Sequence, residues 1–138
     1  LRALKKGETV GLLPDQVPPE GMGVWTDFFG RSAYTMTMAA KLVAQTGCAV
    51  VLLRGERLGL LARLQTGCDY IVHATRVAPD VEQVLASGDA AQSAAAVNRL
   101  MENLIMQAPE QYLWGYNRYK QPRAEILTSA SSGSEAQT

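Results

Sequence analysis

Residues 33–53 read AYTMTMAAKLVAQTGCAVVLL, and this stretch decides the fold class. Its first part, Ala33–Thr46, predicts a helix, because apolar side chains recur at the i, i+3, i+4, i+7 spacing of one helical face. Ser32 can cap the start of this helix, and Gly47 stands where a helix commonly ends. The continuous apolar run Cys48–Leu53 then predicts a buried strand. Because a helix leads into this strand, we expect it to be parallel to its neighbours.

The segments on either side continue this alternation of strands and helices. Two further strands are expected at the apolar or β-branched runs Thr9–Leu13 and Asp69–Ala78. The strongest helix is expected over about Ala90–Ala108, with Ser87 or Asp89 as its cap. One side of this helix is an unbroken apolar stripe. The opposite side carries polar residues, namely Asn98, Arg99, Glu102 and Asn103.

The remaining segments are connections. Pro79–Gly88 is interpreted as a connector, and Pro109 can begin another short helix. Arg54–Gly67 is compatible with either a hairpin arm or a short helix. The order of strands and helices predicts an α/β fold with a mostly parallel sheet flanked by helices.

Composition excludes several classes of protein. The chain has 138 residues, the size of one domain, and its 47% apolar and 19% charged content is that of a folded protein. Thirteen basic and thirteen acidic residues balance, which gives no support to a nucleic-acid partner. No apolar run approaches the ~20 residues of a membrane-spanning helix. Residues 124–138 are a polar, low-complexity tail that we expect to be disordered. The start at Leu1, without a signal-peptide pattern, suggests the cut end of a longer protein.

Cysteine and histidine are too scarce for a closed zinc site. Cys48 and Cys68 are the two cysteines and His73 is the single histidine, so four ligands at recurrent spacing are absent and no metal is expected. A reducing compartment is the default interpretation for two such cysteines. His73 lies inside a predicted strand, and we interpret it as a structural histidine.

Asp15 is the first candidate functional residue, because it stands directly after a predicted buried strand. Ligands of open α/β sheets bind in the crevice beyond such strand ends, where a carboxylate can orient a base or pair with a cation. The alternative is a turn residue that bonds to its own backbone. The residues alone favour the turn.

A second candidate is the aromatic pair Phe28-Phe29, followed by Gly30 and Arg31. The two rings can wall a groove for an apolar chain, or they can belong to the core. Arg31 and Thr35, near a predicted helix start, can meet an anionic group, or they can be a solvated charge and a cap.

A third candidate is the segment from Tyr112 to Arg123, in which tyrosine and tryptophan alternate with cations. This pattern suits a membrane–water interface. The balanced charge argues against RNA stacking. The alternative is an amphipathic helix that packs its aromatic side chains into the domain.

Taken in order, these segments resemble the bacterial lipid A biosynthesis lauroyl/myristoyl acyltransferase family, specifically its C-terminal half. The resemblance rests on motifs that follow one another along the chain: Leu4-Lys5-Lys6-Gly7-Glu8, Gly11-Leu12-Leu13-Pro14-Asp15-Gln16, Phe28-Phe29-Gly30 with Ala33 and Thr35, Asn98 and Glu102, Ala108-Pro109-Glu110-Gln111-Tyr112-Leu113-Trp114, and Asn117-Arg118-Tyr119-Lys120 with Pro122. It covers residues 1–123, which implies the C-terminal portion of a glycerolipid acyltransferase-like α/β domain.

The resemblance implies an enzyme that moves a fatty acyl group from acyl carrier protein to a hydroxyl of a Kdo-bearing lipid A precursor. The implied place is the cytoplasmic face of the bacterial inner membrane, with that membrane surface as a partner. No cofactor beyond the acyl donor and no nucleic acid are implied.

The resemblance also implies roles for particular residues. Asp15 matches an acidic active-site residue. A substrate groove is implied at Gln16, Phe28, Phe29, Gly30 and Thr35. Cations that can steer an acidic carrier protein or anionic head groups are Lys5, Lys6, Arg118, Lys120 and Arg123.

Three departures from the family pattern limit this transfer. The family signature is His-x-x-x-x-Asp/Glu, but the fifth residue after His73 is Ala78. We therefore expect the signature upstream of Leu1, and we expect these 138 residues alone to be inactive. The family's proline near Val51 is missing, and the connector Arg57–Gly67 is longer than usual.

Two other functions remain open. One is a non-catalytic module that binds a membrane or a protein partner. The other is an acyltransferase with a different glycolipid acceptor, as in the related mannoside acyltransferases of mycobacteria.

Overall fold

The structure, a computed structural model, describes residues 1–124. The tail predicted for residues 124–138 therefore lies outside the described residues, apart from Ala124. Helices and strands follow one another as α1 (Arg2–Lys5), β1 (Gly23–Phe28), β2 (Arg31–Met36), α2 (Met38–Thr46), β3 (Val51–Arg57), α3 (Leu60–Thr66), β4 (Tyr70–Arg76), α4 (Pro79–Ala86), α5 (Ala90–Ile105) and the 3-10 helix η1 (Pro109–Gln111).

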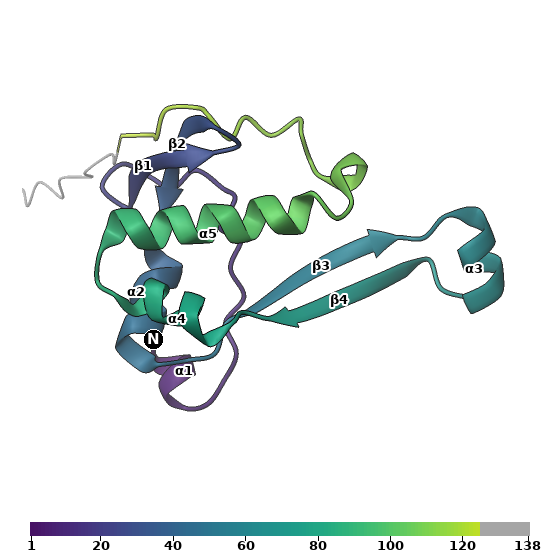
Figure 1. The fold of residues 1–138 in the computed structure, drawn as a ribbon, viewed down its shortest axis with the longest axis horizontal. Coiled ribbons are helices and arrows are strands. Elements are labelled where there is room, and N and C mark those ends of the chain that lie inside the picture. The colour runs from purple at the N-terminus through teal and green to yellow at the C-terminus, as the bar shows by residue number, and fades with distance from the viewer. Residues whose placement is uncertain (125–138) are drawn as a thin grey trace, which may run out of the picture.

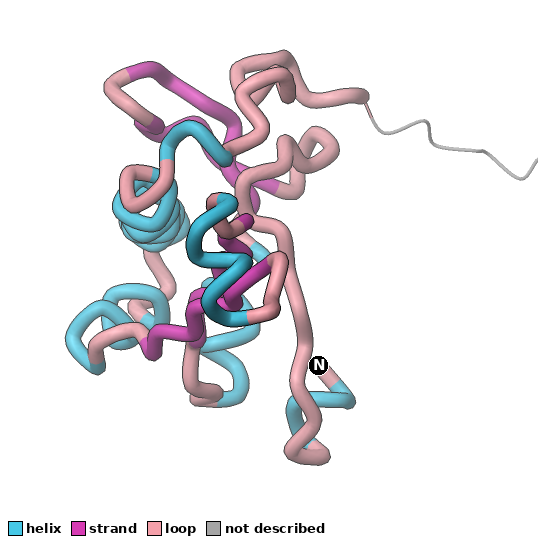
Figure 2. The backbone as a smooth tube through the Cα atoms, turned by 90° about the vertical axis from the view of Figure 1, so that its right-hand side faces the viewer, coloured by secondary structure: helices cyan, strands magenta, loops and turns pink. Residues whose placement is uncertain are grey.

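The α/β class is confirmed, but the parallel sheet is not. Among the described residues the strands form two antiparallel pairs, β1 with β2 and β3 with β4. The segment Thr9–Leu13, expected to be a strand, is loop. It runs from α1 past the base of the β3–β4 pair without joining either sheet (Figures 1 and 2). Its leucines have no strand beside them, and Leu13 is exposed.

The hairpin β1–β2 explains why the predicted helix at Ala33 starts late. Its turn consists of Phe29 and Gly30, whose φ angles are 49° and 72°. Two positive φ values give the turn type whose twist matches paired strands. Residues 31–36 therefore continue as a strand, and Ser32 is not a helix cap. Helix α2 begins only at Met38 and ends, as predicted, at Gly47 in the left-handed conformation.

Strands β3 and β4 form a long projecting hairpin, with α3 at its tip (Figure 1). We call residues 51–76 the arm. The expected parallel strand at Cys48–Leu53 starts at Val51 and pairs with the next strand in sequence, because the twelve residues between them turn back rather than cross over. Arg54–Gly67 thus contains both alternatives considered for it, a hairpin strand (the end of β3) and a short helix (α3).

Helix α5 holds the body of the protein together. Asp89 caps it, since its Oδ1 accepts hydrogen bonds from the backbone N–H groups of Ala91 and Gln92 at 2.9 and 3.0 Å. The predicted connector Pro79–Gly88 is instead helix α4, with Pro79 in its first turn. Two apolar clusters form on α5: Val43, Leu85, Ala96 and Val97 in one, and Phe28, Ala33 and Ile105 in the other.

Within the described residues, no helix combines the length and apolarity that crossing a bilayer requires.

Candidate functional site

The loop that follows Thr9–Leu13 brings Asp15 against the C-terminal part of the chain. The phenol of Tyr112 donates a hydrogen bond to Asp15 Oδ2 at 3.2 Å, although 97 residues separate the two. Asp15 is half-buried and its second oxygen, Oδ1, is not part of this contact. The carboxylate is therefore more than a turn residue bonded to its own backbone.

Residues 112–119 form an irregular segment that lies against the β1–β2 hairpin; they are not the amphipathic helix considered above. Tyr116 Oη accepts a hydrogen bond from the backbone N–H of Val17 at 2.9 Å. Tyr119 donates to the carbonyl of Phe28 at 2.9 Å. The aromatic side chains of this segment thus fasten it to the N-terminal third of the chain.

The two phenylalanines occupy different environments. Phe28 is 2% exposed and belongs to the core. Phe29 is half-buried, with its ring 4.8 Å from that of Phe28 and 5.9 Å from that of Trp114 between centroids. Its backbone N–H donates to Glu102 Oε1 at 2.6 Å, which helps to hold the unusual positive φ. Phe28 is thus a core residue that also lines the pocket described below, whereas Phe29 packs against Trp114.

The other residues predicted to line a substrate groove do not lie together. Gln16 and Gly30 are exposed, and Arg31 lies over the Tyr119 ring at 4.2 Å from its centroid. Thr35, on β2, is fully buried and accepts a hydrogen bond from Asn98 of α5, so no exposed groove can use it directly. The structure therefore brings Asp15, Phe29 and Arg31 to the C-terminal aromatic segment and leaves Gln16 apart.

Thr35 belongs to a buried polar network centred on Arg118. The Arg118 guanidinium donates to the Tyr34 carbonyl and to Thr35 Oγ1, both at 2.8 Å, and to Asn98 Oδ1 at 3.3 Å. Asn98 Nδ2 donates to the carbonyl of Asp27 at 2.7 Å. This network corrects two expectations, because Arg118 is 3% exposed and not a surface cation, and Asn98 lies in the interior, not on a polar helix side.

Burial and charge change the acidity of two groups here. Burial, with the negative charge of Asp15 and the hydrogen bond to it, raises the pKa of Tyr112 to about 12. The phenol is therefore a donor toward Asp15 at neutral pH. Burial lowers the pKa of Arg118, while the surrounding tyrosines and Asp15 oppose that effect. Arginine stays protonated even so.

A pocket of about 340 Å³ lies between the hairpin and the C-terminal segment. It is lined by Phe28, Arg31, Tyr112, Trp114, Gly115, Tyr116, Asn117, Arg118 and Tyr119. Tyr112 belongs both to this pocket and to the Asp15 hydrogen bond. The site therefore combines aromatic walls, two arginines and, through Tyr112, a carboxylate.

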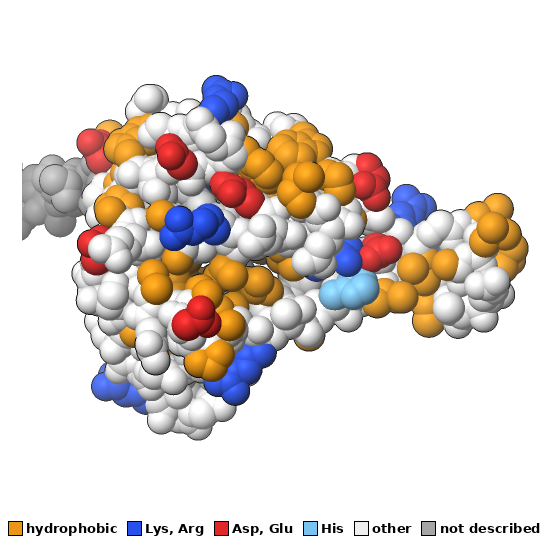
Figure 3. Space-filling model, viewed as in Figure 1, with side chains coloured by type: hydrophobic (Ala, Val, Ile, Leu, Met, Phe, Trp, Pro, Cys, Tyr) orange, Lys and Arg blue, Asp and Glu red, His pale blue; other side chains and the backbone are white. Residues whose placement is uncertain are grey.

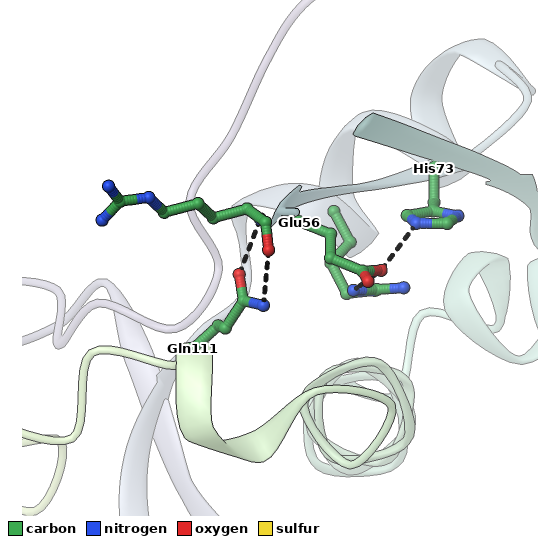
Figure 4. A network of polar contacts seen from close by, with 5 residues as sticks. Glu56, His73 and Gln111 are labelled. Carbon is green, nitrogen blue, oxygen red and sulfur yellow. Dashed lines mark hydrogen bonds and ion pairs between the residues drawn. The ribbon is translucent and has the colours of Figure 1, made fainter. Parts of the chain in front are cut away.

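A second polar cluster lies at the arm (Figure 4). Glu56 Oε2 is 2.9 Å from both His73 Nε2 and Arg54, and Arg54 and His73 together hold the pKa of Glu56 below its usual value. Gln111 bonds the backbone N–H and carbonyl of Arg57 at 2.7 and 3.1 Å, which ties the arm to η1. His73 thus forms a hydrogen bond with Glu56 on the neighbouring strand. Among residues 1–124 no three potential His, Cys, Asp or Glu ligands gather for a metal ion.

Sequence reasoning missed Arg118 and Asn98 as interior partners. Asn98 gave a signal, since it lies four residues after Ala94 and seven before Ile105, which places it on the same helix face as these apolar residues.

Comparison with known proteins places this arrangement in context. The family model described as bacterial lipid A biosynthesis acyltransferase matches residues 1–121. Over 121 residues the chain is 35% identical to the lipid A biosynthesis palmitoleoyltransferase of Escherichia coli (strain K12), an alignment that covers 86% of the chain and 35% of that protein. It is 31% identical to the lipid A biosynthesis lauroyltransferase of the same organism, and that alignment covers 87% of the chain and 36% of the lauroyltransferase. The chain thus spans about a third of the length of the curated relatives it matches.

Proposed function

Because the chain belongs to the bacterial lipid A biosynthesis acyltransferase family, we propose that the protein carrying it transfers a fatty acyl group from acyl carrier protein to a hydroxyl of a lipid A precursor. The acceptor oxygen attacks the carbonyl carbon of the acyl thioester, and the carbon–sulfur bond breaks. A general base takes the hydroxyl proton, which then goes to the departing thiolate. The proposed reaction needs no metal ion, and its place is the cytoplasmic face of the inner membrane.

The observation that carries this proposal for the present residues is the Asp15–Tyr112 hydrogen bond beside the aromatic pocket. A carboxylate can orient a cationic or hydrogen-bonding group of the reaction while the half-buried phenol of Tyr112 fixes one of its oxygens. We therefore assign Asp15 a positioning role in the site.

The pocket supports a lipid substrate. Its walls are largely aromatic, and the exposed ring of Trp114 lies at 5.9 Å from Phe29. Aromatic and apolar walls with few polar groups are typical of sites that take an apolar chain. We propose that Phe28 and Trp114, which line the pocket, border the acyl chain, and that Arg31 contacts an anionic part of a substrate.

The general base is not His73 in this proposal. The fifth residue after His73 is Ala78, and the imidazole already pairs with Glu56 on the arm. We propose that the base belongs to a part of the protein beyond these 138 residues. The 138-residue chain incubated with acyl carrier protein thioester and a lipid A precursor should then give no product, and measurable turnover would show that the base has been misplaced.

The direct test is Asp15→Asn in the complete protein. We expect kcat to fall by more than about a hundredfold, within the range for loss of an acid–base or orienting group. The matched control is Asp27→Asn, an exposed aspartate on β1, which should leave turnover unchanged.

Tyr112→Phe separates positioning from folding, because it removes the phenol while keeping the carboxylate. If Asp15 acts in the site, Asp15→Asn should lose far more activity than Tyr112→Phe at equal thermal stability. Equal losses of activity that track equal losses of stability would reduce Asp15 to a structural residue.

A further inference from the structure

The tip of the arm exposes an unusual amount of apolar surface. Leu60, Leu61 and Leu64 of α3 are 69%, 77% and 75% exposed. We call these three leucines the arm tip. Figure 3 shows apolar side chains at the far end of the arm, well away from the body of the protein. Monomeric proteins rarely leave such groups together in water, so a contiguous apolar patch usually marks a contact surface.

Apolar exposure continues along the strands behind the tip. Leu53 on β3 and Tyr70 and Val72 on β4 are each more than half exposed. Each strand of the arm has seven residues, which at about 3.3 Å per residue gives a reach of roughly 20 Å. The arm is bonded to η1 through Arg57 at the far end of β3, and the arm tip lies beyond that point.

The charge of the arm favours an anionic partner. Residues 51–76 contain four arginines and two acidic residues, whereas the whole chain is neutral. Three of the four arginines form ion pairs: Arg54 with Glu56, Arg63 with Asp69, and Arg76 with Glu82 of α4. Arg57, at the end of β3, forms no ion pair within the described part of the chain. Helix α3 contains no acidic residue.

We propose that the arm tip inserts into the head-group region of an anionic lipid bilayer. Leucines that enter the acyl boundary, arginines whose long stems let the guanidinium reach phosphate groups, and a tyrosine beside them form the pattern of an interfacial anchor. A bilayer accepts exposed leucines without a complementary pocket. The net positive charge of the arm adds attraction to anionic head groups.

This inference deepens the proposed function and rests on it, because it assigns the membrane contact to one element. Lipid binding is measured here without acyl transfer. If the wild-type chain does not bind vesicles while the complete protein still catalyses transfer on detergent-dispersed substrate, the arm-tip proposal alone is refuted. If the chain binds vesicles but the complete protein transfers no acyl group, the acyltransferase proposal alone is refuted.

The test compares three forms of the chain by flotation with vesicles. The tip variant is Leu60→Ser, Leu61→Ser and Leu64→Ser. The matched control replaces three exposed apolar side chains of the body, as Leu13→Ser, Met106→Ser and Leu113→Ser. Vesicles contain phosphatidylcholine alone or mixed with phosphatidylglycerol. Because all six side chains are exposed, both variants should keep the far-ultraviolet circular dichroism of the wild type.

We expect the wild type to bind the anionic vesicles, and the tip variant to lose more than about tenfold in partition coefficient. The control should stay within about twofold of the wild type. Arg57→Gln should weaken binding to anionic vesicles only, and more so at low salt. Leu61→Trp should show a blue-shifted fluorescence when anionic vesicles are added.

Three results would overturn the proposal. The first is a wild type that does not bind vesicles at all, and the second is a tip variant that binds them as strongly as the wild type does. The third result is a wild-type dimer in sedimentation equilibrium that the tip variant does not form. The last result would assign the arm tip to a second copy of the chain.

Discussion

The buried amide of Asn98 makes the sharpest prediction about stability. Its side chain is 1% exposed, and Nδ2 donates to the Asp27 carbonyl at 2.7 Å and to Thr35 Oγ1 at 3.0 Å. Asn98 Oδ1 accepts from Arg118 at 3.3 Å. Asn98→Ala leaves the part-buried Asp27 carbonyl and a buried Arg118 N–H without these partners. Each orphaned group costs about 1–3 kcal/mol, so we expect a loss of about 3–5 kcal/mol in the free energy of unfolding.

Urea unfolding followed by circular dichroism and tryptophan fluorescence measures this loss. At about 3 °C or more per kcal/mol for a chain of this size, the melting temperature should fall by roughly 10 °C or more. Asn103→Ala is the matched control, because Asn103 is an exposed asparagine on the same helix and alanine favours helix slightly more. A loss below about 1 kcal/mol in Asn98→Ala would refute the idea that this network holds β1, β2 and α5 together.

Three further predictions concern the hairpin, the arm and the site. Gly23→Ala places a methyl group 2.6 Å from a β2 carbonyl oxygen and should lower the free energy of unfolding in urea by about 1–3 kcal/mol. Gly55→Ala is the control, because its methyl group meets nothing within 4 Å. Equal urea midpoints of the two variants would contradict this packing. Hydrogen bonds from Arg54 and His73 hold the pKa of Glu56 below 4.5. The carboxylate therefore stabilises the fold above that pH, and this contribution disappears as the pH falls. Glu56→Gln should make the urea midpoint depend less on pH on the acid side, and an unchanged slope would count against these two contacts of Glu56. Asp15→Asn should move the phenolate titration of Tyr112 from about 12 toward 10.0 in absorbance measurements, and an unmoved midpoint would mean that burial alone raises that pKa.

Elements with strong local signals were predicted well. Helix α5 combines an apolar stripe with an Asp89 cap, and both its start and its type are as expected. Strand β4 follows from its β-branched and aromatic residues. The left-handed Gly47 ends α2 because glycine adopts a positive φ without strain.

The wrong predictions concern segments whose secondary structure or strand direction depends on pairing with another strand. Residues 33–36 share apolar spacing with the helix that follows, but the positive-φ turn at Phe29-Gly30 pairs them with β1 instead. Strand direction was inferred from a helix that precedes β3, whereas the hairpin partner lies after it. Neither pairing leaves a mark in the local pattern of apolar residues.

The candidate site was predictable in part. Asp15 followed from its place after an apolar run and from family resemblance, although that run is not a strand. Its partner Tyr112, 97 residues away, had no local signal. Arg118 resembled a surface cation, because the tyrosines next to it in sequence do not reveal its hydrogen-bond acceptors. These acceptors lie on β2 and α5. Contacts of this kind depend on the folded chain and not on spacing.

The hydrogen bonds of residues 112–119 also govern when the protein can fold. Four of them join this segment to residues 15–34, across sequence separations of 84 to 99 residues. During synthesis on the ribosome the β1–β2 hairpin and Phe28 must wait, uncovered, until Tyr119 has emerged. Closing such long loops is slow, and the waiting nascent chain exposes apolar surface that chaperones recognise. A ribosome stalled after Ile105 would therefore hold an unfinished core.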